Sequence, residues 1–200
     1  MELKSINCRT PDFIKMAQTG FTLMEMLIVL AIIGIIASIA VPNFTDMIVE
    51  QRVRTVASEL LNDIVVTRVE AIKQQRRVNM ERTGTTWKEG WRIYVDGTQN
   101  ATDTPNGTYE VGEVLIKESV GFGTSTLKVC PIDATLADRI IFRGDGTVSN
   151  TIIGTESGLR VSDDRGIGGN AGGRTRNIAI SPAGRASIES LDKSTGVVCP

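Results

Sequence analysis

The sequence Gly20-Phe21-Thr22-Leu23-Met24-Glu25, followed by an apolar run as far as Val41, decides how this chain is organised. Glu25 is the only charged residue between Phe21 and Val41, and Pro42 follows the run. A helix of this length matches the hydrocarbon core of a bilayer, which is about 30 Å thick. The stretch therefore predicts a membrane-spanning helix over residues 21–42.

Residues 1–20 are a polar and charged leader that contains Glu2, Lys4, Arg9, Asp12 and Lys15. An ordinary secretory signal places its small-residue cleavage site after the apolar run, and this run has no such site. The cleavage site is therefore expected before the run, after Gly20.

Gly-Phe-Thr-Leu-x-Glu ahead of a long apolar run and a proline resembles the class III signal of type IV prepilins and type II secretion pseudopilins. The resemblance implies that a prepilin peptidase cuts after Gly20 and methylates the new N-terminus at Phe21. It also implies that Glu25 neutralises the N-terminal amine of a neighbouring subunit as helices stack into a filament.

Physical reasoning on Glu25 points the same way. A carboxylate near the end of an apolar helix is costly, so it normally marks a functional position with a partner. An acid near a helix N-terminus also interacts favourably with the macrodipole. The alternative is that the Glu25 side chain merely extends to the lipid headgroups and has no partner in a neighbouring subunit.

Composition argues against an enzyme. The chain contains no histidine, which removes the commonest general base and metal ligand. Its formal net charge is −1, so there is no overall basic field that would attract nucleic acid. We expect no cofactor and no metal.

The chain has three cysteines, and Cys8 lies in the leader. Cys130 and Cys199 remain after cleavage, and an even count in an exported domain predicts a disulfide between them. Closing a loop of about seventy residues stabilises a fold by roughly 4 kcal/mol in the chain-entropy model. Two unpaired thiols are the alternative, and a zinc site is excluded for want of ligands.

Past Pro42 the chain continues as an amphipathic helix to about Gln75. Apolar residues recur there at spacings of three and four: Phe44, Ile48, Val49, Val53, Val56, Leu60, Ile64 and Ala71. Charged residues fall mostly between them: Glu50, Arg52, Arg54, Glu59, Asp63, Arg68 and Lys73. Pro42 lacks an amide hydrogen and is expected to kink this helix rather than end it.

Two further runs narrow the resemblance. Glu70-Ala71-Ile72-Lys73 and Gly90-Trp91-Arg92-Ile93-Tyr94-Val95-Asp96 are similar to runs of the H-type minor pseudopilins and the T- and U-type fimbrial minor pilins. The resemblance implies a pilin-like α+β fold, in which one long helix packs on antiparallel sheets. Residues 43–200 then form the globular head.

Alternating apolar residues predict short strands, which after one long helix favour an α+β fold. Trp91-Ile93-Val95 forms the buried face of one strand, and Asp96-Gly97 its turn. Other strands are expected at Val114–Glu118, Leu127–Val129, Arg139–Phe142, Thr147–Ser149, Leu159–Ser162, Arg176–Ser181 and Ala186–Ile188. Loops are expected at 98–112 and 163–173.

Three other local patterns resemble functional motifs, but each gives only weak evidence of function. The glycine loop at 163–173 precedes a strand pattern rather than the helix that a dinucleotide site needs. Asp145-Gly146 after Arg143-Gly144 favours a hairpin turn over an adhesion motif. Asp163 and Asp164 have too few oxygen ligands near them for a calcium loop.

Arginines near the C-terminus offer a DNA-binding alternative. Gly173-Arg174-Thr175-Arg176 resembles the Gly-Arg-x-Arg motif of the T-type minor pilins, which is tied to DNA capture. A hairpin around Ser181–Gly184 would bring Arg185 near Arg174 and Arg176, and such a cluster would bind phosphates with little sequence preference. Solvated strand-edge residues are the other interpretation.

The favoured function is therefore a minor structural subunit that helps initiate or cap a type IV pilus. The alternatives are the H-type minor pseudopilin of type II secretion and a DNA-binding minor pilin for transformation. The expected partners are other pilin or pseudopilin subunits, the prepilin peptidase, inner-membrane lipid and, in the last case, DNA. The expected location is the bacterial inner membrane, with one span and a periplasmic head, and then the filament.

Overall fold

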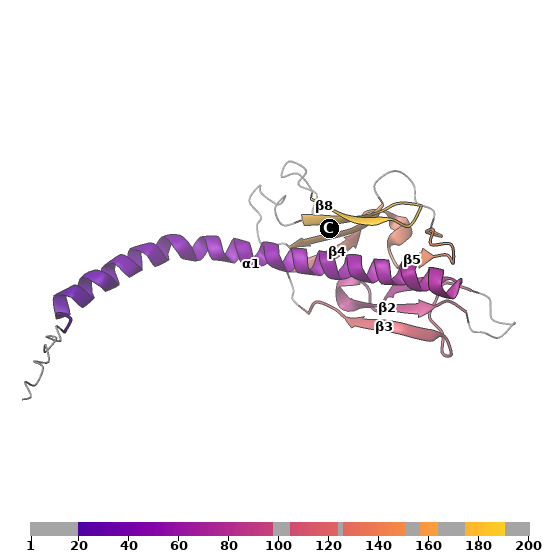
Figure 1. The fold of residues 1–200 in the computed structure, drawn as a ribbon, viewed down its shortest axis with the longest axis horizontal. Helices are drawn as coiled ribbons and strands as arrows, with labels where there is room; N and C mark the ends of the chain where they lie inside the picture. The colour runs from indigo at the N-terminus through magenta and orange to yellow at the C-terminus, as the bar shows by residue number, and fades with distance from the viewer. Residues whose placement is uncertain (1–19, 98–104, 124–125, 151–156, 164–174, 191–200) are drawn as a thin grey trace, which may run out of the picture. The chain divides into compact units, whose positions relative to one another are not determined.

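A computed structural model of the chain describes residues 20–97, 105–123, 126–150, 157–163 and 175–190, with side chains except at 39–46 (Figure 1). Cys8, Cys199, Arg174, residues 164–173 of the glycine loop and the leader up to residue 19 lie outside the described residues. The chain divides into two compact units, Met1–Asn43 and Phe44–Pro200. The helix α1 (Leu23–Gln74) contributes to both units, so each unit is described by itself.

In the first unit, α1 is exposed on every side. All residues from Gly20 to Ser38 are exposed, including large apolar side chains such as Phe21, Leu23 and Leu30. A helix that is apolar all round needs an apolar environment from outside the unit. Within the described part of the chain, no helix reaches the length and hydropathy of a membrane span.

The second unit contains two antiparallel four-stranded sheets. The order in the first sheet is β3 (Val114–Val120), β2 (Gly90–Val95), β1 (Val78–Arg82) and β5 (Arg139–Phe142). The order in the second sheet is β4 (Leu127–Pro131), β6 (Gly158–Asp163), β7 (Thr175–Ile180) and β8 (Ala186–Ser190). The predicted α+β fold, one long helix with antiparallel sheets, is confirmed.

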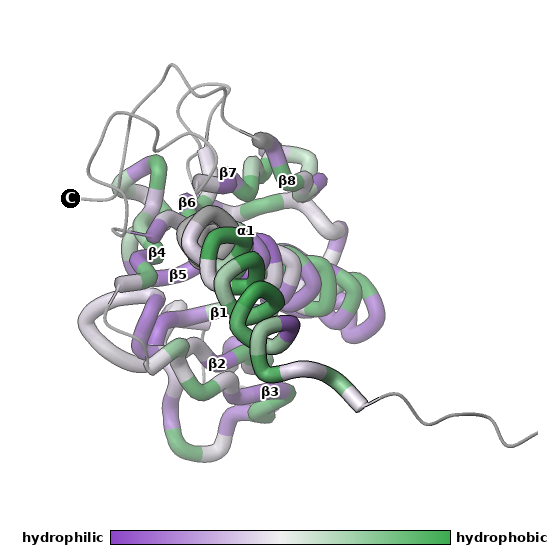
Figure 2. The backbone as a smooth tube through the Cα atoms, turned by 90° about the vertical axis from the view of Figure 1, so that its left-hand side faces the viewer, coloured by the Kyte–Doolittle hydropathy of each residue, from purple (hydrophilic) through white to green (hydrophobic). Residues whose placement is uncertain are grey.

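The core lies between α1 and both sheets, whose strands are arranged around the helix in Figure 2. Six of the predicted helix positions are buried: Val49, Val53, Val56, Leu60, Ile64 and Ala71. Two predictions were wrong. Ile48 is exposed, and Asp63, expected among the outward charges, is completely buried.

Most strands form where the apolar alternation predicts them, but Thr147–Ser149 does not. That segment makes a single bridge between Val148 and Phe142, because the chain has just left the turn at Arg143–Thr147. Two 3₁₀ helices, η1 (Trp87–Glu89) and η2 (Ala134–Leu136), were not predicted. They are joined across the core, where the Trp87 indole Nε1 donates to the Leu136 carbonyl at 3.2 Å.

Candidate functional site

The N-terminal turn of α1 is built by the predicted signal residues. The hydroxyl oxygen of Thr22 accepts a hydrogen bond from the Glu25 backbone N–H at 3.2 Å, so Thr22 caps the helix and Glu25 occupies its third position. Thr-x-x-Glu is the spacing of a capping box. The exposed Glu25 carboxylate thus lies in the first turn, where the helix dipole stabilises a negative charge.

The helix continues through Pro42 without ending, as its assigned range of Leu23–Gln74 shows. The kink predicted at Pro42 remains a prediction.

In the second unit, α1 presents an uncharged apolar stripe to solvent. Val65, Val69 and Ile72 are 44%, 53% and 46% exposed, and their spacing of four and three places them on one helix face. An outward face is usually polar. This face, which we call the outer stripe, is therefore a candidate contact surface.

The rotation of α1 about its axis is fixed by the buried Asp63. Its carboxylate accepts from the Trp91 Nε1 on β2 at 2.8 Å and from the Lys117 Nζ on β3 at 2.6 and 2.9 Å. Because α1, β2 and β3 meet at one carboxylate, the outer stripe is held away from the sheet. The helical pattern contained the signal, since Asp63 lies between the core positions Leu60 and Ile64.

A second clamp on α1 is Arg68. Its guanidinium donates to the Gly146 carbonyl at 3.0 Å and to the Ala183 carbonyl at 3.1 Å. These carbonyls belong to two turns, one after β5 and one between β7 and β8. Gly184 in the second turn has φ +78 and lies so close to the Gly146 carbonyl oxygen that an added Cβ would be 2.0 Å from it. Arg68 thus joins both sheets to the helix.

The Arg143-Gly144-Asp145-Gly146 segment forms a tight turn, as expected. The Asp145 carboxylate accepts from the Thr147 backbone N–H at 2.9 Å and from its hydroxyl at 2.6 Å. These bonds lower the pKa of Asp145. The Asp145 carboxylate is therefore engaged in stabilising this turn.

Two of the three arginines in the predicted cluster, Arg176 and Arg185, lie apart, and Arg174 is outside the described residues. The β7–β8 hairpin forms around Pro182–Gly184, but Arg176 pairs with Ser190 at its open end while Arg185 lies beside the turn. Arg185 is five residues from Ser190 along the chain, so about 17 Å of strand separates the two positions. Arg176 also points to α1, where its Nη2 lies 3.2 Å from the Glu50 carboxylate.

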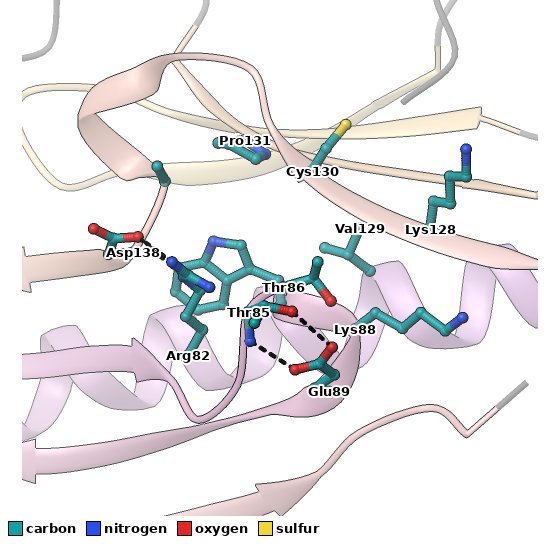
Figure 3. A pocket seen from close by; sticks show the side chains of 12 residues that line it. Arg82, Thr85, Thr86, Lys88, Glu89, Lys128, Val129, Cys130, Pro131 and Asp138 are labelled. Carbon is teal, nitrogen blue, oxygen red and sulfur yellow. Dashed lines mark hydrogen bonds and ion pairs between the residues drawn. The ribbon is translucent and has the colours of Figure 1, made fainter. Parts of the chain in front are cut away.

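A pocket of about 650 Å³ lies between η1 and β4 (Figure 3). Its carboxylates are paired with their neighbours. Asp138 accepts from Arg82 at 2.6 Å, and Glu89 accepts from the Thr85 N–H and hydroxyl at 2.6 and 2.9 Å, which lowers the pKa of Glu89. No three metal-ligating side chains converge anywhere in the described ranges.

Cys130 on β4 lines this pocket and is disulfide-bonded. The predicted partner Cys199 lies outside the described residues, so the pairing itself stays a prediction.

A long capped helix with an exposed apolar first half, followed by a head with two antiparallel sheets, defines a pilin-like filament protein. The model "Type II transport protein GspH" matches residues 56–184, and "Prokaryotic N-terminal methylation motif" matches residues 15–41. The chain belongs to the GspH family. The pilin and pseudopilin families are structural rather than enzymatic.

The chain is also similar to individual pilins. It is 28% identical to the pilin-like protein PilA1 of Thermus thermophilus over 178 residues, 87% of this chain and 100% of PilA1. It is 33% identical to a fimbrial protein of Pseudomonas aeruginosa over 111 residues, 52% of this chain and 71% of that protein. The crystal structure of the P. aeruginosa type IV minor pilin FimU shares the fold, with a TM-score of 0.50 at 22% identity over 70% of this chain and 89% of FimU.

Proposed function

We propose that this chain is a minor subunit of a type IV pilus that helps to initiate or cap the filament. The main support is the first unit, in which the whole apolar start of α1 is exposed. Side chains such as Leu27 and Ile33 are buried in a stable state only by lipid or by other subunits. A filament core of packed helices meets that need.

The subunit begins in the inner membrane under this proposal, with residues 21–42 as the single span and residues 43–200 as the periplasmic head. Support comes from the sequence, which has one charged residue between Phe21 and Val41. The prepilin peptidase removes residues 1–20 and methylates Phe21. The match of the methylation motif to residues 15–41 supports this step.

Glu25 neutralises the amine of Phe21 in a neighbouring subunit. Its place in the first turn and its exposed carboxylate leave it available for such a partner. On the head, the outer stripe of Val65, Val69 and Ile72 provides a separate contact surface.

Glu25→Gln tests this role, because glutamine preserves the capping-box position while removing the charge. We expect the variant to be cleaved and methylated but at least tenfold depleted from sheared filaments, since an unpaired buried amine is costly. Thr22→Ala is the control, because it removes the cap and leaves the charge. Equal incorporation of Glu25→Gln and wild type would contradict the role.

The H-type minor pseudopilin of type II secretion is the second candidate, and the match of the GspH model to residues 56–184 favours it. Deleting the gene separates the two. Loss of surface pili with normal protein secretion supports the pilus, whereas retained pili with secretion lost supports the pseudopilus.

DNA binding receives less support, because Arg176 is engaged with Glu50 and Arg185 lies at the other end of the hairpin. Alanine at Arg174, Arg176 and Arg185 is expected to leave DNA affinity unchanged in low salt. A clear loss, with a reduced salt dependence, would restore this function.

A further inference from the structure

The strand β4 has an open edge. It lies at one side of the second sheet and pairs only with β6 among the described strands. The Ile132 N–H donates to the Gly158 carbonyl at 2.8 Å, so these residues form a hydrogen-bonded pair at the end of the β4–β6 ladder. Such pairs alternate along an antiparallel ladder. Cys130 and Lys128 therefore also bond to β6, whereas the N–H and C=O groups of Val129 point away from the sheet.

The edge of the first sheet at β5 is closed, in contrast to β4. The Ile141 N–H donates to the Asn150 Oδ1 at 2.8 Å, and the Ile141 carbonyl accepts from the Ser149 N–H at 2.7 Å. Val129 has no such partner in the described part of the chain, although it is only 5% exposed. A buried backbone group without a hydrogen bond is costly. A further strand beside β4 would therefore remove that cost.

The pocket between η1 and β4 runs along this open edge. Four consecutive residues of β4, Lys128–Pro131, line it. Because side chains alternate between the two faces of a strand, a cavity that contacts four consecutive residues faces the strand edge rather than one face. The volume of about 650 Å³ is within the range of ligand-binding pockets, and the five residues of β4 offer about 17 Å of edge.

The pocket has a surplus of positive charge, since three cationic side chains and two carboxylates line it. Both carboxylates, Asp138 and Glu89, already accept hydrogen bonds within the fold. The Lys88 ammonium makes no hydrogen bond or ion pair with any described residue. In the view of Figure 3, Lys88 and Lys128 lie at the end of the pocket away from Asp138. A carboxylate on a ligand would meet unlike charge at this end.

We propose that the pocket binds an extended acidic segment of another polypeptide, which adds to β4 as a further strand. The backbone of this segment pairs with Val129, and one of its carboxylates binds Lys88. In strand addition the main-chain hydrogen bonds provide affinity and the side-chain contacts provide specificity. The proposal is independent of which filament the protein serves.

A peptide array tests the recognition of acidic segments. It carries heptapeptides of alternating threonine and valine, in which glutamate or, in the matched set, lysine occupies each position in turn. The full-length protein in detergent should be retained at least about fivefold more strongly by the glutamate set, because the half-buried Lys88 favours an opposite charge. Lys88→Glu should reverse this preference. The matched control Lys73→Glu, in the last turn of α1, should keep it.

Equal retention by the two sets, or no retention by either, would overturn the proposal. An unchanged preference in Lys88→Glu would do the same, because the acidic group would then be recognised elsewhere.

Amide hydrogen exchange tests whether the bound peptide adds to β4. With the most strongly retained peptide bound, exchange of the Val129 N–H should slow at least about tenfold, because a new hydrogen bond protects it. Exchange at Lys128 and Cys130 should change much less, because their N–H groups already bond to β6. Unchanged exchange at Val129, or equal slowing at all three amides, would rule out strand addition at this edge.

Discussion

At the scale of single residues, Asp63 contributes most to the position of the helix. It is fully buried, yet it accepts hydrogen bonds from Trp91 and Lys117, so its charge is paired. Asp63 lies three residues after Leu60 and so on the buried face by helical spacing, but its charge led us to expect it on the solvent side. The sequence could not show that two partners from later strands would reach this position.

Asp63→Ala is expected to destabilise the fold by about 3 kcal/mol, because it leaves Trp91 and Lys117 without their acceptor. The free energy of unfolding is measured by urea denaturation of the full chain in detergent. Glu59→Ala, at a half-exposed acid one turn earlier, should change it by less than about 0.5 kcal/mol. Similar values for the two variants would show that the Asp63 network is unimportant.

Tyr94 gives the fold a dependence on alkaline pH. Burial raises the pKa of Tyr94, whose hydroxyl donates to the Gly107 carbonyl at 2.8 Å. A group with a raised pKa contributes stability that is complete below its ordinary value near 10 and is lost as the pH rises further.

We therefore expect the free energy of unfolding of the wild type to fall steeply as the pH rises above about 10. In Tyr94→Phe it should fall less steeply. Thermal melts between pH 7 and 11 measure this. An unchanged slope in Tyr94→Phe would assign the alkaline transition to other groups. The variant should also be less stable at pH 7, because the Gly107 carbonyl loses a donor.

At the scale of elements, α1 has an inner face that binds the sheets and an outer stripe that faces solvent. Val69→Lys on this stripe should leave stability within about 0.5 kcal/mol, because Val69 is already 53% exposed. Incorporation into sheared filaments should nevertheless fall several-fold, because a lysine would be buried at the subunit contact. Quantitative immunoblotting of filament fractions measures the effect.

The same substitution at Val111, a fully exposed valine in the loop before β3, is the matched control. It should change neither stability nor incorporation. Equal incorporation of Val69→Lys and Val111→Lys would exclude the outer stripe as a contact surface.

Strands in which apolar and polar residues alternate clearly were predicted from the sequence. Strands that depend on contacts with residues far away in the chain were missed. β5 formed at Arg139–Phe142 as expected, and Trp91, Ile93 and Val95 are buried. The range of β1 was not predicted, because Asn79 is buried through contacts with Tyr94 and later strands. For the same reason the site is only partly predictable. The signal around Glu25 is local, whereas the separation of Arg176 from Arg185 depends on the hairpin register.

At the scale of the whole molecule, the chain combines an exposed apolar helix with a folded head, and the boundary between its two units falls at Asn43. The head can be stable in water because its core is closed by α1 and both sheets. In the first unit, every residue whose side chain the structure describes, 20–38, is exposed. The proposed passage from membrane to filament would supply the apolar surroundings that the exposed start of α1 needs.

The most direct test of this account is the intact mass of the protein purified from membranes of cells with and without the prepilin peptidase. We predict that the peptidase removes residues 1–20 and that the new N-terminus at Phe21 carries one added methyl group. Without the peptidase the full chain should remain. An unprocessed mass in both strains would contradict the account, because Gly20 to Glu25 would then not act as a filament signal.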